Sequence, residues 1–159
     1  MKRVIYPGSF DPITKGHMNI IEQASNLFDE ILVVVMKNPN KKNSMFTEEE
    51  RAELIKEIYK DNSQVKVLIG EGATVDVAEE NNCCAILRGL RSLTDYNYEV
   101  EMQQFNQDIS NNNIKTICLF ADKNYQFLSS SIVKEVFSLN KDISKYVDPV
   151  VIKKMQEKR

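Results

Sequence analysis

The sequence predicts an α/β protein: a Rossmann-like, doubly wound, five-stranded parallel sheet with helices on both faces, in a single domain over residues 1–159. Five short apolar runs alternate with segments of helical periodicity, as in strand–helix–strand units. One run, Ile31–Met36, is apolar without interruption, which is typical of a parallel strand covered on both faces. The length suffices for one sizeable core, and 42% hydrophobic and 28% charged residues are those of an ordinary globular protein.

The elements follow in order along the chain. Strands are expected at Val4–Tyr6, Ile31–Met36, Val65–Ile69, Cys83–Leu87 and Ile114–Phe120. The helices between and after them are expected to bury, in turn, Ile20, Ile21, Ala24, Leu27 and Phe28; Leu54, Ile55, Ile58 and Tyr59; Val75 and Ala78; Tyr98, Met102, Phe105 and Ile109; and Ile132, Val133, Val136 and Phe137. A capping box at Thr47–Glu50 starts the second helix, and Asp148 with Pro149 starts a C-terminal helix from about residue 148.

Charge and cysteine content exclude several classes of protein. A net charge of −2 gives no global field for nucleic acid or an acidic membrane surface, so neither partner is expected. The first residues lead straight into a strand, with no signal-peptide core and no apolar run of membrane-spanning length. Cys83, Cys84 and Cys118 suit neither a zinc site nor a disulfide framework, and we expect buried, reduced thiols in a cytoplasmic protein.

The segment from Tyr6 to His17 is a long turn between the first strand and the first helix. Two prolines stiffen it and two glycines allow close approach of the backbone: Pro7, Pro12, Gly8 and Gly16. The helix start should present free N–H groups and partial positive charge, a setting suited to an anion. His17, the only histidine, lies at that helix start. A phosphate is therefore the expected ligand there.

Polar clusters follow all five expected strands: this turn, Lys37–Lys42, Gly70–Thr74, Arg88–Arg91 and Asp122–Ser131. Because parallel strands end at one edge of a sheet, the clusters predict a binding site at that edge. Two arginines three residues apart suit a polyphosphate, although ion pairing with Asp95, Glu99 or Glu101 competes for one of them. A Walker loop is absent, and Val75 replaces the third glycine of a dinucleotide fingerprint, which argues against a dehydrogenase.

The motifs resemble those of one enzyme family. Thr14-Lys15-Gly16-His17 resembles the (H/T)xGH signature of the nucleotidyltransferase superfamily, and the flanking Tyr-Pro-Gly-Ser-Phe-Asp-Pro narrows the resemblance to bacterial phosphopantetheine adenylyltransferases. Ser129-Ser130-Ser131 before Ile132-Val133-Lys134-Glu135-Val136 is similar to that family's SSS-x-V-K-E-V motif. The resemblance covers nearly the whole chain. It implies transfer of AMP from ATP to 4′-phosphopantetheine, giving dephospho-coenzyme A and pyrophosphate in coenzyme A biosynthesis.

The resemblance also implies roles for particular residues. His17 and Lys41 are the expected catalytic residues, with Lys42 as the alternative lysine. Phosphopantetheine is expected to contact Ser9, Lys41, Thr74 and Arg88. The expected ATP contacts are Ser9, Phe10, His17, Gly89, Leu90, Arg91, Glu99, Tyr125, Gln126, Phe127, Leu128, Ser129, Ser130 and Ser131. No protein metal site is expected.

In the implied reaction the acceptor's own phosphate attacks the α-phosphate of ATP, so no protein base or covalent adduct is needed. Mg²⁺ is expected as the counter-ion of the nucleotide, bound through phosphate oxygens and water. A homohexamer is expected from the family, and the sequence leaves open whether coenzyme A binds as a feedback ligand. Two alternatives remain: a sister adenylyl- or cytidylyltransferase acting on another small phosphate, and a nucleotide-binding sensor without turnover.

Overall fold

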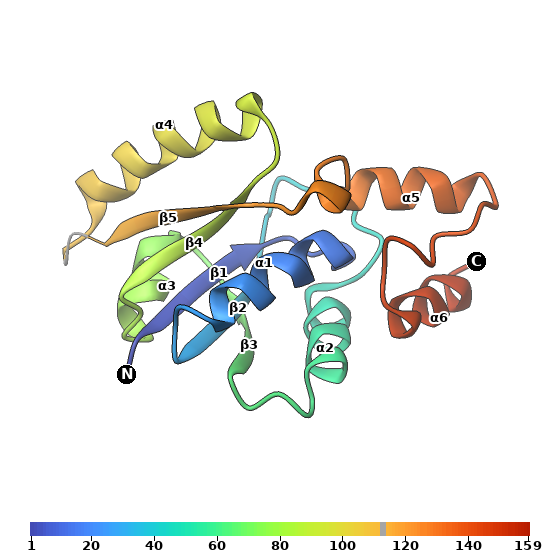
Figure 1. Ribbon diagram of the computed structural model, residues 1–159, viewed down its shortest axis with the longest axis horizontal. Helices are drawn as coiled ribbons and strands as arrows, with labels where there is room; N and C mark the ends of the chain where they lie inside the picture. Colours follow the sequence, from blue (N-terminus) through green and yellow to red (C-terminus); the bar gives the residue numbers. More distant parts are fainter. Residues whose placement is uncertain (112–113) are drawn as a thin grey trace.

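The computed structural model describes residues 1–111 and 114–159. Within them, five parallel strands form one sheet in the order β3-β2-β1-β4-β5, with helices on both faces (Figure 1). The strands are β1 (Arg3–Gly8), β2 (Glu30–Met36), β3 (Val65–Gly70), β4 (Ala85–Leu90) and β5 (Lys115–Phe120). The helices are α1 (Lys15–Ser25), α2 (Glu48–Ile58), α3 (Thr74–Glu80), α4 (Leu93–Ile109), a short 3₁₀ helix η1 (Lys123–Tyr125), α5 (Ser130–Ser138) and α6 (Pro149–Glu157). The predicted fold class is confirmed.

Successive side chains of a strand point to opposite faces, and this alternation divides the core in two. Val4 and Tyr6 of β1 pack on the face covered by α1 and α2, and α5 and α6 extend the same cluster. Ile5 points to the other face, where α3 supplies Val75 and Ala78. Along β2 the five residues 31–35 are all buried, as predicted for a strand covered on both sides. None of the helices in the described part of the chain is long and apolar enough to cross a membrane.

The predicted caps are present. The Thr47 hydroxyl accepts a hydrogen bond from the Glu50 amide at 3.1 Å, and the Glu50 carboxylate accepts one from the Thr47 amide at 2.9 Å. Asp148 caps α6 by accepting from the amide of Val150, with Pro149 in the first turn. Such caps are local, because they need only a residue type at a fixed spacing. The sequence therefore predicted these two helix starts to the residue.

Strand β4 differs from its prediction of Cys83–Leu87. It begins at Ala85 and continues through Arg88 and Gly89 to Leu90, because its ladder with β5 continues to the Leu90–Phe120 pair. A charged side chain within a strand looks like a strand end in the sequence. Here it is accommodated because the guanidinium of Arg88 is hydrogen-bonded to protein acceptors.

Several expected core positions are exposed instead. Leu27 lies beyond the end of α1, and Ile132 lies on the outer side of α5. The largest difference is in α4, whose expected core residues Tyr98 and Phe105 are 55% and 58% exposed. The helix itself is confirmed, but its aligned apolar face points away from the core of this chain. The cysteines are free, and only Cys83 is buried, so the expectation of burial was wrong for the other two, which are Cys84 and Cys118.

The turn after β1 is fixed by the Asp11 carboxylate, which is 1% exposed. It accepts hydrogen bonds from the amides of Met45 and Phe46, both at 2.9 Å, and from the Lys134 ammonium at 3.1 Å. Burial raises the pKa of Asp11, but these hydrogen bonds outweigh it and hold the pKa below its usual range. One ionised carboxylate thus joins the turn, the segment before α2, and α5.

We predict that Asp11→Ala lowers the free energy of unfolding by about 3 kcal/mol, because it leaves the buried amide of Phe46, the partly buried amide of Met45 and the Lys134 ammonium without their acceptor. Urea denaturation of the variant and the wild type measures this. The matched control is Asp108→Ala, which removes an exposed carboxylate from α4 and should change stability by less than about 0.5 kcal/mol. Equal, small effects of both substitutions would show that Asp11 does not hold the turn.

Candidate active site

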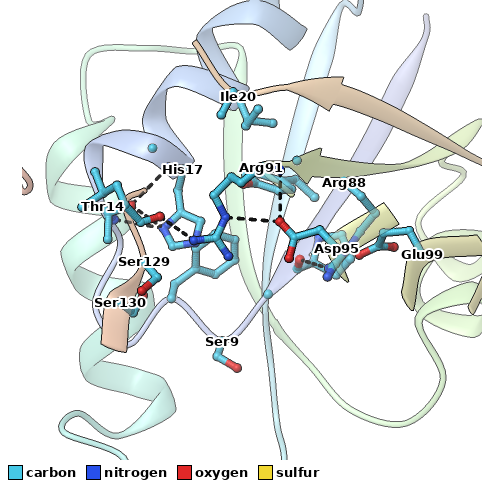
Figure 2. A pocket seen from close by; sticks show the side chains of 18 of the residues that line it. Ser9, Thr14, His17, Ile20, Arg88, Arg91, Asp95, Glu99, Ser129 and Ser130 are labelled. Carbon is cyan, nitrogen blue, oxygen red and sulfur yellow. Dashed lines mark hydrogen bonds and ion pairs between the residues drawn. The ribbon is translucent and has the colours of Figure 1, made fainter. Parts of the chain in front are cut away.

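A cavity of about 460 Å³ opens where β1 and β4 separate at their carboxyl ends (Figure 2). The two strands pair only at Val4–Ala85 and Ile5–Ile86, whereas the ladder of β1 with β2 continues to Gly8. This is the position where the strand order reverses direction, the usual ligand site of open parallel sheets. The cavity is lined by Tyr6, Pro7, Gly8, Ser9, Phe10, Thr14, Gly16, His17, Ile20, Arg88, Gly89, Arg91, Thr94, Asp95, Tyr98, Glu99, Ala121, Leu128, Ser129 and Ser130.

His17 lines the cavity from the first turn of α1, and its ring has a defined tautomer. Nδ1 accepts a hydrogen bond from the Thr14 amide at 3.0 Å and lies 3.1 Å from the Thr14 hydroxyl, which in turn accepts from the His17 amide. A neutral imidazole whose Nδ1 accepts carries its proton on Nε2. His17 is therefore a hydrogen-bond donor through Nε2.

The charge state of His17 follows from its surroundings. Although the ring keeps some exposure through the cavity, burial and then the positive charges of Arg91 and Arg88 lower its pKa from 6.5 to about 3. The imidazole is neutral at pH 7. It can donate one hydrogen bond to an anion without holding a full positive charge.

The start of α1 offers fewer backbone donors than the sequence suggested. The Lys15 amide donates to the carbonyl of Tyr146 and the His17 amide donates to Thr14. At α5, Ser129 caps the helix by accepting from the Ile132 amide, and the Ser130 hydroxyl donates to the carbonyl of Pro12. Within the described residues, the first two amides of α5 have no hydrogen-bond acceptor in the protein. The helix start that suits a phosphate is thus that of α5.

Arg88 and Arg91 both face the cavity and both pair with α4. Arg88 donates from Nε to Glu99 at 2.8 Å, and Nε of Arg91 lies 3.5 Å from Asp95. The competing interpretation, ion pairing for one arginine, therefore holds for both arginines. The pairs leave both guanidiniums at the cavity wall (Figure 2).

Lys41 approaches the cavity from the loop between β2 and α2. Its ammonium lies 3.3 Å from the hydroxyl of Ser9, a residue that lines the cavity. Lys42 is exposed and makes no contact of this kind among the described residues. The geometry favours Lys41 over Lys42 as the lysine that reaches a ligand.

Comparisons with known proteins agree with this arrangement. A family model described as cytidylyltransferase-like matches residues 5–136. A phosphopantetheine adenylyltransferase from Finegoldia magna is 45% identical over 98% of this chain and 95% of that protein. One from Alkaliphilus metalliredigens is 42% identical over 99% of both. The chain belongs to the phosphopantetheine adenylyltransferase family.

A solved structure supports the fold assignment. It is a Plasmodium falciparum nicotinic acid mononucleotide adenylyltransferase complexed with NaAD, which superimposes with a TM-score of 0.68. The identity is 21%, and the match covers 99% of this chain and 96% of that one. At that identity the likeness concerns the fold alone.

The structure brings many of the expected site residues together and leaves others apart. Those that line the cavity are Ser9, Phe10, His17, Arg88, Gly89, Arg91, Glu99, Leu128, Ser129 and Ser130. The rest of the expected set lies outside its lining: Lys41 at the Ser9 hydroxyl, Thr74 at the start of α3, Leu90 in the core, Ser131 in α5, Tyr125 at the end of η1, and Gln126 and Phe127 between η1 and α5. The roles expected for both groups, the residues that line the cavity and those outside it, remain predictions.

Three further residues shape the site in roles that the sequence analysis did not assign to them. Asp95 pairs with Arg91, and Thr14 orients the ring of His17. Ile20 leaves room only for glycine at position 89, because a Cβ added there would lie 2.9 Å from Ile20 Cγ1. Thr14 was part of the recognised motif, but its hydrogen bond to the ring could not be read from spacing alone. Asp95 was considered only as a competing ion pair.

Because the chain has one histidine, its imidazole can be followed without assignment. We predict that ¹⁵N NMR of the folded protein shows a neutral ring protonated on Nε2, with no titration between pH 5 and 8. The unfolded chain in urea should titrate near 6.5, and between the two pKa values it binds more protons than the folded state. Acidification below about pH 6.5 should therefore lower stability through this group. A folded ring that titrates near 6.5, or one protonated on Nδ1, would contradict the site described above.

Proposed function

We propose that the protein transfers the adenylyl group of ATP to 4′-phosphopantetheine, giving dephospho-coenzyme A and pyrophosphate, a step of coenzyme A biosynthesis. Membership of the phosphopantetheine adenylyltransferase family supports the substrates. The observation that carries the chemistry is the neutral donor His17 beside two arginines and a free helix start, in one cavity. These groups suit a reaction at a phosphorus atom whose transition state gathers negative charge.

The chain's residues can perform this reaction by positioning and hydrogen bonding. The acceptor's phosphate is already ionised at neutral pH, so it can attack the α-phosphate without a protein base. Nε2–H of His17 donates to the α-phosphate oxygen, and the Lys41 ammonium adds positive charge on the Ser9 side. Arg91 and the start of α5 hold the departing pyrophosphate, and Arg88 holds the acceptor.

Mg²⁺ is part of the proposal as the counter-ion of ATP. Among the described residues, no group of three His, Cys, Asp or Glu side chains is placed to hold a metal ion. The carboxylates that line the cavity, Asp95 and Glu99, are each paired with an arginine. The residues therefore fit a metal that arrives with the nucleotide's phosphates rather than one held in a protein cage.

We also propose a homo-oligomer, a hexamer by family resemblance, that is located in the cytoplasm. Exposed apolar side chains on α4 and on the neighbouring edge strand β5 support an association surface: Leu93, Tyr98, Val100, Phe105, Ile109 and Phe120.

The free thiols support a reducing compartment, which cell fractionation would test. Coenzyme A, which shares the pantetheine arm of the product, is proposed as a feedback ligand of the same cavity, and competition with phosphopantetheine in a binding assay would test it.

The first test of the function is ³¹P NMR of the protein with ATP, Mg²⁺ and 4′-phosphopantetheine. We expect pyrophosphate and a new diphosphate diester to form, and ADP to be absent. Nicotinic acid mononucleotide, the matched control acceptor, should give no product. ADP without pyrophosphate would indicate a kinase, and AMP attached to the protein in mass spectrometry would indicate a covalent route. Either result would overturn the proposal, as would equal activity with the control acceptor.

In the same assay we predict that His17→Ala lowers kcat by roughly a hundredfold, as for other lost donors to transition-state charge. Its thermal unfolding temperature confirms that the protein is folded. Chelation of Mg²⁺ by EDTA should lower the rate in the wild type. Near-normal turnover of the variant would remove His17 from the mechanism.

The association surface is tested by light scattering after size exclusion. We expect the wild type to be larger than a monomer and Phe105→Glu to yield smaller species, because a charge is costly within an apolar interface. Leu27→Glu, at a residue that is 58% exposed like Phe105 but is not part of this surface, is the control and should keep the wild-type mass. A monomeric wild type would contradict the proposal.

A further inference from the structure

Asp95 has no role in the function proposed above, although it lines the cavity. A carboxylate is an unexpected neighbour for polyphosphate, since it repels the ligand's charge. The charged side chains lining the cavity are Arg88, Arg91, Asp95 and Glu99, two positive and two negative. With His17 neutral, their charges cancel, so the arginines do not act by making the cavity strongly cationic.

The two arginines are held in the same way. Each directs Nε to a carboxylate of α4: Arg88 to Glu99 at 2.8 Å and Arg91 to Asp95 at 3.5 Å. Each also donates from Nη1 to a backbone carbonyl, Arg88 to Pro7 at 2.8 Å and Arg91 to Leu128 at 2.6 Å. Within the described residues, Nη2 of both has no protein acceptor. The protein thus holds each guanidinium on two sides and leaves one nitrogen available.

Asp95 holds Arg91 through the backbone as well. Its carboxylate accepts a hydrogen bond from the Arg91 amide at 3.0 Å, and its own amide donates to the Ser92 hydroxyl that caps α4. The same carboxylate oxygen therefore fixes both ends of Arg91, main chain and guanidinium. Glu99, one helical turn further along α4, contacts Arg88 through the guanidinium only.

We infer that Asp95 is a positioning residue for nucleotide binding: it holds the Arg91 guanidinium so that Nη2 meets a terminal phosphate of ATP. An unrestrained arginine loses considerable rotamer freedom when it binds a phosphate, and restraint in advance removes that cost. The inference rests on the proposed function, because it takes ATP as the ligand. It assigns to Asp95 an effect that acts through Arg91 alone.

The test is a double-mutant cycle measured by calorimetric titration with MgATP, without acceptor. Asp95→Ala should weaken ATP binding about fivefold, as for a partly exposed pair that orders its partner. In the Arg91→Ala background the same substitution should have no further effect. Asp95→Asn, which keeps an acceptor for the Arg91 amide but loses the charge, should fall between Asp95→Ala and the wild type. The control is Glu57→Ala, which removes the partner of Lys60 in an exposed ion pair on α2 and should leave ATP binding unchanged.

Kinetics give the second readout. Asp95→Ala should raise the KM for ATP and leave the KM for phosphopantetheine within twofold, whereas general loosening of the cavity would change both. Suppose that the wild type binds ATP and releases pyrophosphate. The assignment would then be overturned if Asp95→Ala bound ATP as tightly as the wild type or more tightly. It would also be overturned if the losses in affinity were additive in the double variant. A wild type that bound no ATP would instead overturn the proposed function itself, and the assignment with it.

Discussion

The buried carboxylate of Asp11 is the interaction on which the cavity's wall depends. Its bonds to Met45 and Phe46 fix the end of the loop that carries Lys41, and its bond to Lys134 fixes α5. Each contact satisfies a group that would otherwise be costly to bury. Three segments far apart in the sequence are therefore held to one turn by one side chain, and the turn itself leads into the helix that carries His17.

In the cavity, the imidazole donor is uncharged, and the positive charge lies on other residues, the two arginines. His17 donates while neutral, because burial and the neighbouring arginines oppose its protonation. Each of the two arginines is paired with a carboxylate of α4. Such a cavity is rich in directed donors and nearly neutral as a whole. This arrangement stabilises charge that develops in a reaction more than it attracts anions at a distance.

The sequence predicted what depends on local patterns. The strand–helix order, the Thr47 and Asp148 caps and the position of the site at the carboxyl edge follow from apolar spacing and residue type. The end of β4 was wrong because Arg88 continues a ladder that only its neighbour β5 defines.

The apolar face of α4 was assigned to the core because periodicity shows that a face is apolar without showing what covers it. Asp11 was missed for a similar reason. Its partners lie 34, 35 and 123 residues away, and no spacing rule connects them.

The short ladder between β1 and β4 has a mechanical consequence. The other neighbouring strands share six residue pairs each, whereas β1 and β4 share two, both near their amino ends. The sheet therefore consists of two groups of strands, β3-β2-β1 and β4-β5, which are joined in the ladder by these two residue pairs. Splaying of the two groups at their carboxyl ends would break the hydrogen bond from Arg88 Nη1 to the Pro7 carbonyl, which joins β4 to β1 beyond the ladder. Arg88, a residue of the cavity wall, therefore also holds the two groups of strands together where the ladder between them is absent.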